Sequence, residues 1–174
     1  MELKPTRLWR TAPLALAALC ALALAGCCCT RPVSTTGEPR KLLFIGDSFT
    51  YYNGGIGQHV KLLAAAAKVP KAIVADSETK GGATLKILFG RQSVHDRIRA
   101  GYDLVVLQDD IPEFREHTVE PFFEYAGRLV EEARQAGSQT VLFMAWPYER
   151  LSWVSLPEIV RAHRQLSAQL RIPV

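Results

Sequence analysis

The sequence predicts an α/β fold, in which a parallel sheet carries helices on both faces. From Lys41 onward, strand-like runs alternate with helix-like segments, which is the order expected for strands joined by helical crossovers. The strand-like runs are almost continuously apolar, as in strands that are buried on both faces. The 174 residues, 48% hydrophobic and 22% charged, suit one globular domain.

Four strands and four helices are predicted in alternating order, with no internal repeat. They are strand 41–46, helix 56–69, strand 71–78, helix 93–101, strand 102–108, helix 118–136, strand 139–146 and helix 155–170. The first strand, KLLFIG, is a short apolar run that ends at a glycine, and YDLVVLQ at 102–108 is the most strand-like stretch. The last residues, RIPV at 171–174, predict the opening of a fifth strand.

The helices are predicted from composition, from the spacing of apolar residues and from capping residues. Segment 56–69 is rich in Ala and Leu and is followed by a proline. Segments 93–101 and 155–170 begin with capping boxes, in which Ser93 precedes Asp96 and Ser155 precedes Glu158. Segment 118–136 ends before a glycine, and its apolar face consists of Phe122, Ala126, Leu129, Val130 and Ala133.

Polar residues and glycines follow the predicted strands at the points where these strands end. They are Ser48 after the first strand, Gly81 and Gly82 after the second, Gln108 and Asp109 at the end of the third, and Trp146 at the end of the fourth. In parallel sheets ligands bind beyond the carboxyl ends of the strands, so we expect these residues at one rim. A serine nucleophile needs a base and donors for an oxyanion. The backbone N–H groups of Ser48 and Gly82 and the Gln108 amide are suitable donors.

The segment FIGDSFTYYN resembles the first conserved block of the SGNH (GDSL-type) hydrolases, in the variant written G-[DN]-S-[FL]-T-x-x-N. KGGATL resembles the glycine block of that family and YDLVVLQDD its third block, so the likeness runs from Lys41 to about Trp146. The resemblance implies a flavodoxin-like three-layer α/β/α sandwich. It also implies hydrolysis of lipid, acyl or carbohydrate esters. No cofactor and no metal are expected.

Carried over by position, the resemblance assigns the catalytic roles. Ser48 is the expected nucleophile and first oxyanion donor, and Gly82 is the second donor, with Gly81 as the alternative. The third block of the family supplies an Asn side chain, and Gln108 stands nearest to that position. The segment differs from the G-x-S-x-G nucleophile elbow because Thr50 occupies the place of the second glycine.

Residues beside Ser48 are expected to support its loop, with Asp47 as a brace and with Thr50 and Asn53 as hydrogen-bonding residues. The final block of the family is D-x-x-H, whose His is the general base and whose Asp orients the base. This sequence contains no D-x-x-H. We therefore expect a chain truncated before that block and lacking the Asp/His pair.

The histidines that are present are expected to be structural, since none stands at the carboxyl end of a predicted strand; they are His59, His95, His117 and His163. His163 falls on the apolar stripe of its helix and is expected to pack there. Asp109 and Asp110 are interpreted as a solvated strand end rather than as metal ligands. Aromatic residues that either line an ester pocket or pack in the core or rim are Tyr51, Tyr52, Trp146 and Trp153.

The first 40 residues form a different kind of sequence. A basic stretch precedes a short apolar run and then LAGC at 24–27, which resembles a bacterial lipobox. We expect residues 1–26 to be a lipoprotein signal peptide and residues 27–40 to be a tether that starts at an acylated Cys27. The domain is expected to cover 41–174, held at the bacterial cell envelope by its lipid anchor. An uncleaved signal anchor and a plain secretory signal are the alternatives.

The charge and cysteine content exclude several classes of protein. The net charge is +4, and beyond residue 26 it is +2, with no basic stripe, so no nucleic-acid partner is expected. All cysteines lie at or before residue 29, so the folded domain has no disulfide.

A nucleotide-binding flavodoxin-like domain is disfavoured because GDSFTYYNGG places aromatic residues where phosphates need open backbone N–H groups.

The sequence therefore predicts a serine ester hydrolase of the SGNH type. It would act on an acyl or carbohydrate ester through an acyl-serine intermediate. The alternative is a lipoprotein of the same fold that binds an ester or sugar without turnover. The expected partners are the ester substrate and, through the lipid anchor, the membrane.

Overall fold

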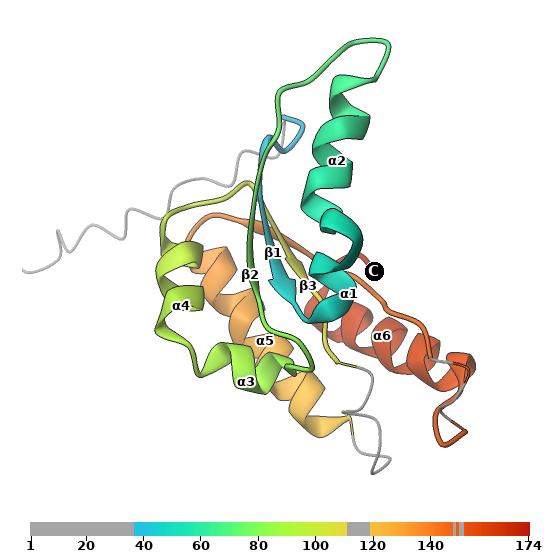
Figure 1. Ribbon diagram of the computed structural model, residues 1–174. Coiled ribbons are helices and arrows are strands. Elements are labelled where there is room, and N and C mark those ends of the chain that lie inside the picture. Colours follow the sequence, from blue (N-terminus) through green and yellow to red (C-terminus); the bar gives the residue numbers. More distant parts are fainter. Residues whose placement is uncertain (1–36, 111–118, 148, 150–151) are drawn as a thin grey trace, which may run out of the picture.

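A parallel sheet of four strands, in the order β2–β1–β3–β4, forms the centre of the molecule (Figure 1). This computed structural model describes residues 37–110, 119–147, 149 and 152–174. The strands are β1 (Lys41–Gly46), β2 (Val74–Thr79), β3 (Leu104–Leu107) and β4 (Gln139–Leu142). The parallel sheet expected from the apolar runs is confirmed.

Helices connect the strands, and several of them are very short. They are α1 (Ser48–Tyr51), the 3₁₀ turn η1 (Tyr52–Gly54), α2 (Ile56–Ala65), α3 (Leu85–Phe89), α4 (Gln92–Arg99), α5 (Glu120–Gln135) and α6 (Leu156–Leu170). The sequence did not predict α1, η1 or α3, because helices of three to five residues are too short to show an apolar period.

The helices cover the sheet on both faces, as the predicted α/β/α arrangement requires. Alternate side chains of β1 point to opposite faces. Leu43 and Ile45 pack in a large cluster that also contains side chains of α3, α4, α5 and α6. Leu42 and Phe44 lie on the other face, in a small cluster that Ile56 and Val60 of α2 cover. Among the described helices, α2 alone packs on the small cluster. Figure 1 shows α2 on one side of β1 and α3, α4 and α5 on the other.

The register brings the carboxyl ends of the strands to one edge. Gly46 pairs with Thr79, and Leu107 pairs with both Ile45 and Leu142. The residues that follow these strand ends therefore meet at one rim, as predicted from the sequence.

Several predicted boundaries were wrong. The predicted helix 56–69 ends at Ala65, and the predicted strand 71–78 begins only at Val74, which pairs with Lys41 at the start of β1. Neither α2 nor the stretch after it contains a buried residue. Alanine content favours a helix there, but no packed face extends it.

One of the two predicted capping boxes is present. The Glu158 carboxylate accepts hydrogen bonds from the backbone N–H and hydroxyl of Ser155, each at 2.7 Å. The Ser93 box is wrong, because α4 already begins at Gln92 and Ser93 lies inside the helix. The Ser93 hydroxyl instead donates to Glu78 in β2, over 2.9 Å.

The predicted strand at 171–174 is also absent from the described structure. Arg171 ends α6 with a left-handed φ of 54°, and the side chain of Ile172 is buried. The Pro173 carbonyl accepts one hydrogen bond, of 2.9 Å, from the Leu142 N–H of β4. The segment therefore touches the edge of β4 without forming the repeated bonds of a strand.

Candidate active site

Ser48 stands where β1 passes into α1, at the carboxyl end of the sheet. Gly46 ends β1, Asp47 caps α1, and Ser48 is the first helical residue. The Asp47 carboxylate is fully buried and accepts a 2.8 Å hydrogen bond from the Phe49 N–H. The backbone N–H of Ser48 belongs to the first turn of α1, whose N–H groups have no partner within the helix. The sequence GDS thus places a serine at the carboxyl end of a central strand, with its backbone N–H available as a donor.

Gln108, directly after β3, fixes the Ser48 loop through hydrogen bonds of its side chain. Its Oε1 accepts a hydrogen bond of 2.9 Å from the Asp47 N–H and another of 2.8 Å from the Thr50 hydroxyl. Its Nε2 donates to the Asp109 carbonyl, at 2.5 Å, and the side chain is only 1% exposed. Gln108 thus braces the Ser48 loop through its amide oxygen, and its role as the third oxyanion donor stays a prediction.

Gly46 is a further residue of this site that the sequence reasoning missed. A Cβ atom at Gly46 would lie 2.3 Å from the Thr50 Oγ1 and 2.6 Å from the Gln108 Oε1. Both distances are well below van der Waals contact, so only glycine allows the Gln108 side chain to reach the loop. The glycine that precedes Asp-Ser in the motif is the signal that could have identified it.

The glycine pair after β2 forms a turn beside α1. The Lys80 N–H donates to the Gly46 carbonyl over 3.2 Å, and the Ala83 N–H donates back to the Lys80 carbonyl over 3.2 Å. Gly82 has a positive φ of 62° and open space where a side chain would stand. A Cβ at Gly81 would lie 2.8 Å from the Tyr51 hydroxyl. The turn therefore places exposed glycine backbone next to the Ser48 helix, where the sequence predicts the second donor.

Asp109 and Asp110 are not the solvated strand end that the sequence suggested. Their side chains are 4% and 6% exposed. The Asp109 Oδ1 accepts a hydrogen bond of 2.5 Å from the Leu85 N–H, at the start of α3. Asp109 thus ties the end of β3 to the segment that follows the glycine turn. Among the described residues, no group of three or more His, Cys, Asp or Glu side chains is placed to hold a metal ion.

Ser48 opens onto a pocket of about 440 Å³. Its lining residues are Ser48, Phe49, Tyr52, Asn53 and Trp146. Phe49 and Trp146 meet edge to face with ring centroids 4.9 Å apart, so the segment after β4 is fixed against α1. Tyr52 is 71% exposed and Trp146 is 56% exposed, which leaves aromatic surface facing solvent at the pocket.

The other predicted aromatic and loop residues take separate positions. Tyr51 lies against Gly81, whereas Trp153 lines a different depression, together with Val119 and Val154. Asn53 adopts the left-handed conformation, with φ 53° and ψ 39°, which asparagine tolerates better than most residues. Its backbone carbonyl accepts a hydrogen bond of 2.9 Å from His59.

Each described histidine bonds a group other than Ser48. His59 is exposed and bonds Asn53, and His95 lies between Glu132, at 2.7 Å, and the Phe89 carbonyl, at 2.6 Å. His163 is buried against the Phe122 ring, as the sequence predicted, and burial lowers the pKa of its imidazole. The fourth histidine of the sequence, at 117, lies outside the described residues.

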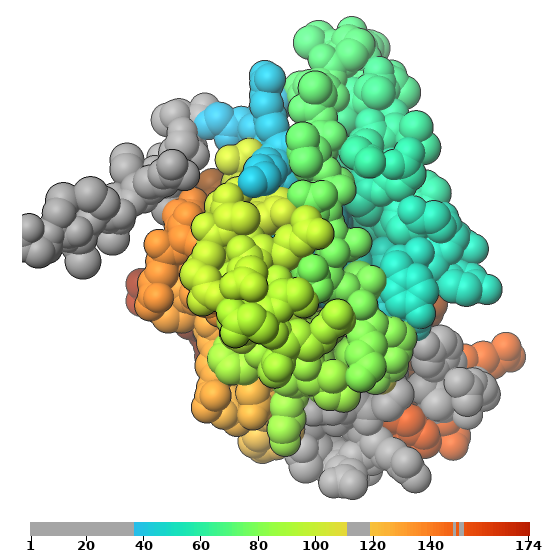
Figure 2. Space-filling model, turned by 60° about the vertical axis from the view of Figure 1, so that its left-hand side comes forward, coloured from blue at the N-terminus to red at the C-terminus, as the bar shows by residue number. Residues whose placement is uncertain are grey.

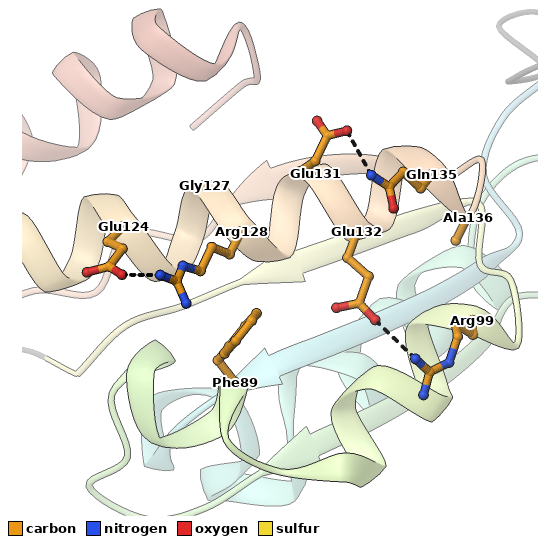
Figure 3. Close-up of a pocket in the computed structure, with 9 residues that line it drawn as sticks. All are labelled: Phe89, Arg99, Glu124, Gly127, Arg128, Glu131, Glu132, Gln135 and Ala136. Carbon is orange, nitrogen blue, oxygen red and sulfur yellow. Dashed lines mark hydrogen bonds and ion pairs between the residues drawn. The ribbon is translucent and has the colours of Figure 1, made fainter.

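A larger groove, of about 1030 Å³, lies along α5 and shares no lining residue with the Ser48 pocket (Figure 3). Most of its charged side chains form ion pairs with one another, whereas Glu131 accepts a 3.1 Å hydrogen bond from Gln135. Arg128 bonds Glu124 at 2.6 Å, and Arg99 lies 3.9 Å from Glu132. Arg128 also stands over the Phe89 ring, 5.6 Å from its centroid. Because these arginines are paired and no serine lines the groove, it is not the candidate site for serine chemistry.

Solved structures resemble this architecture, whereas no family model and no curated protein sequence matches the chain. One is a protein from Slackia heliotrinireducens classed as an SGNH hydrolase, with a TM-score of 0.64 and 19% identity over 78% of this chain and 77% of that one. The chain has the SGNH hydrolase fold. The acetylxylan esterase Axe2 from Geobacillus stearothermophilus has a TM-score of 0.59 and 20% identity, over 78% of this chain and 75% of its own.

The SGNH fold extends to further esterases with little sequence likeness. The psychrotrophic esterase EstA from Pseudoalteromonas sp. has a TM-score of 0.61 at 14% identity, over 78% of this chain and 76% of its own. At identities this low, the structural likeness establishes the shared fold and nothing finer. The roles of Ser48, Gly82 and the loop residues depend on their positions in this structure and remain predictions.

Proposed function

We propose that the chain is a serine ester hydrolase of the SGNH type that acts on an acyl or carbohydrate ester. The observation that carries this proposal is the position of Ser48. It begins α1 at the carboxyl end of β1, and it opens onto the pocket beside Tyr52 and Trp146. Among the described residues its hydroxyl has no hydrogen-bond partner, so it is available to a substrate.

In the proposed reaction, the Ser48 Oγ attacks the ester carbonyl carbon as a base takes its proton. The carbonyl electron pair moves onto the oxygen, and the backbone N–H groups of Ser48 and Gly82 stabilise this oxyanion. Collapse of the intermediate expels the alcohol, which takes up the proton, and leaves an acyl-serine. Water then attacks the acyl carbon and releases the acid. Gln108 contributes by fixing the loop that carries Ser48.

The exposed aromatic faces beside Ser48 suggest how a substrate binds. Tyr52 and Trp146 present flat apolar surface next to the nucleophile. Such surfaces suit the apolar face of a sugar ring or a short acyl chain. Replacing Trp146 with alanine is expected to raise KM about tenfold and to change kcat less, because the ring binds the substrate and does not touch the reacting bond.

The decisive experiment measures hydrolysis of p-nitrophenyl acetate and of acetylated xylo-oligosaccharides by the full-length protein. Ser48→Ala is expected to abolish turnover, whereas Ser77→Ala, at an exposed position in β2, is the matched control and is expected to retain it. Equal activity in the wild type and Ser48→Ala would refute the proposal.

A binding protein without turnover is the second candidate, because the described histidines all bond groups other than Ser48. It would hold an ester or sugar between Tyr52 and Trp146. Calorimetric titration with acetylated oligosaccharides separates the two functions. Binding without hydrolysis by the full-length protein would favour the second candidate, and hydrolysis that Ser48→Ala abolishes would exclude it.

We also propose that the domain is carried at the bacterial cell envelope by an acylated Cys27, with residues 1–26 removed and 27–40 as tether. The lipobox-like LAGC supports this. No helix in the described part of the chain is long and apolar enough to cross a membrane. Mass spectrometry of the purified protein tests the anchor: Cys27→Ser is expected to lose the acyl mass, and Cys28→Ser to keep it.

A further inference from the structure

Apolar side chains are exposed at the end of the molecule where the strands begin. Leu62 and Leu63 in α2 are 56% and 73% exposed, Val69 in the following loop is 72% exposed, and Val74 at the start of β2 is 54% exposed. We call these four residues the amino-end patch. No residue of α2 is buried. The helix packs on the sheet through Ile56 and Val60, and its other faces are open to solvent.

The residues beside and between the members of the amino-end patch include several lysines. Residues 56–73 contain Lys61, Lys68 and Lys71 and no acidic residue. Lys71 forms an ion pair with Glu38, whereas Lys61 and Lys68 have no ion-pair partner among the described residues. Exposed apolar side chains with adjacent lysines suit the surface of an anionic bilayer, where the apolar groups enter the interface and the lysines meet lipid head groups.

The first described residues lie at the same end of the molecule. The Val74 N–H donates to the Arg40 carbonyl over 2.8 Å, and Lys71 pairs with Glu38. Figure 2 shows this first segment, in blue, beside the green loop that follows α2. The ten Cα-to-Cα steps from Cys27 to Gly37 can span at most about 35 Å. A lipid on Cys27 would therefore keep the amino-end patch close to the bilayer.

We propose that the amino-end patch, with Lys61 and Lys68, docks on the anionic membrane in which the acylated Cys27 is anchored. A second copy of the chain fits the patch less well, because pairing two such patches would bring their lysines together. Docking rests on the lipid anchor and does not require catalysis.

The orientation has a consequence for the substrate, which does rest on the proposed ester hydrolysis. The Ser48 pocket lies at the opposite end of the sheet, beyond the six residues of β1, a distance of about 20 Å. A domain docked by its amino end directs that pocket away from the bilayer. Its substrate is then an ester in the aqueous phase or the cell wall and not a lipid of the supporting membrane.

Spin labelling tests the docked orientation in the full lipid-anchored protein, after mass spectrometry has verified the acyl group on Cys27. In a Cys28→Ser, Cys29→Ser background, a nitroxide is attached to Leu63→Cys. The matched control is Ile87→Cys, at an exposed position in α3 near the other end of the sheet. The proteins are reconstituted in phosphatidylcholine vesicles with phosphatidylglycerol, and collision rates are measured with oxygen and with a water-soluble nickel chelate.

Docking predicts that the label at 63 collides more often with oxygen and less often with the chelate than the label at 87. Lys61→Glu with Lys68→Glu is expected to reduce this contrast at least fivefold, because each lysine near an anionic surface changes binding by about that factor. Equal, water-like collision rates at both positions would overturn the proposal, as would protection at 63 that grows with protein concentration. An unacylated Cys27 would also overturn it. Ester hydrolysis, measured on the same samples, reports separately on the proposed function.

Discussion

The two ends of the sheet are built in opposite ways. At the carboxyl end, buried hydrogen bonds fix the Ser48 loop, and Gln108 alone bonds both Asp47 and Thr50. At the amino end, Leu63 and its neighbours are exposed and α2 has no buried residue. A site for bond chemistry needs fixed atoms, whereas a surface that meets lipid needs accessible apolar groups. The difference matches the two roles that we propose, with ester chemistry at the carboxyl end and membrane docking at the amino end.

The largest effect is expected from removing the brace of the carboxyl end. Gln108→Ala leaves the Asp47 N–H and the Thr50 hydroxyl buried without their acceptor, so the free energy of unfolding is expected to fall by about 3 kcal/mol. Urea unfolding measures this, with Gln135→Ala on the exposed side of α5 as the control. A loss below about 1 kcal/mol would show that the loop does not depend on Gln108.

A slightly smaller effect is expected from crowding the same end. Gly46→Ala places a methyl group 2.3 Å from the Thr50 Oγ1, so the loop must shift, and the protein is expected to lose about 1–3 kcal/mol of stability. The shift also moves Ser48, so kcat is expected to fall more than KM rises. Gly37→Ala, where a Cβ meets no atom within 4 Å, serves as the control. Unchanged stability and kcat would contradict the packing described for Gly46.

A modest, pH-dependent effect is expected from His163, which is buried against the Phe122 ring. Burial lowers its pKa below the ordinary 6.5. The unfolded chain then binds a proton at a higher pH than the folded one, so stability is expected to fall as the pH drops below about 6.5. His163→Leu is expected to flatten the change in unfolding free energy between pH 7.5 and 5.5. An unchanged slope would assign the acid sensitivity to other groups.

The smallest effect is expected at the amino end. Leu63→Ser is expected to change the free energy of unfolding by less than about 0.5 kcal/mol and to leave kcat/KM for soluble esters unaltered, since the side chain is 73% exposed. A loss of several kcal/mol would mean that Leu63 contributes to packing, and the contrast between the two ends would fail.

The sequence predicted the sheet and the meeting of four strand ends, because apolar runs and the glycines after them are local signals. It misjudged elements whose extent depends on packing. The Ala-rich helix was predicted four residues too long, because no buried contact supports its end. Ser93 was predicted to cap its own helix but instead donates a hydrogen bond to Glu78 in β2. The sequence also could not predict the directions of side chains. Only the three-dimensional arrangement shows that the Gln108 amide faces the Ser48 loop.

Covalent labelling tests whether Ser48 is the reactive nucleophile that we propose. The full-length protein is treated with a fluorophosphonate, which phosphonylates activated serines, and the modified peptide is identified by mass spectrometry. We expect one phosphonate, on Ser48, and none on Ser48→Ala. Labelling of another serine, or an unmodified Ser48 in a full-length protein that still hydrolyses esters, would contradict it.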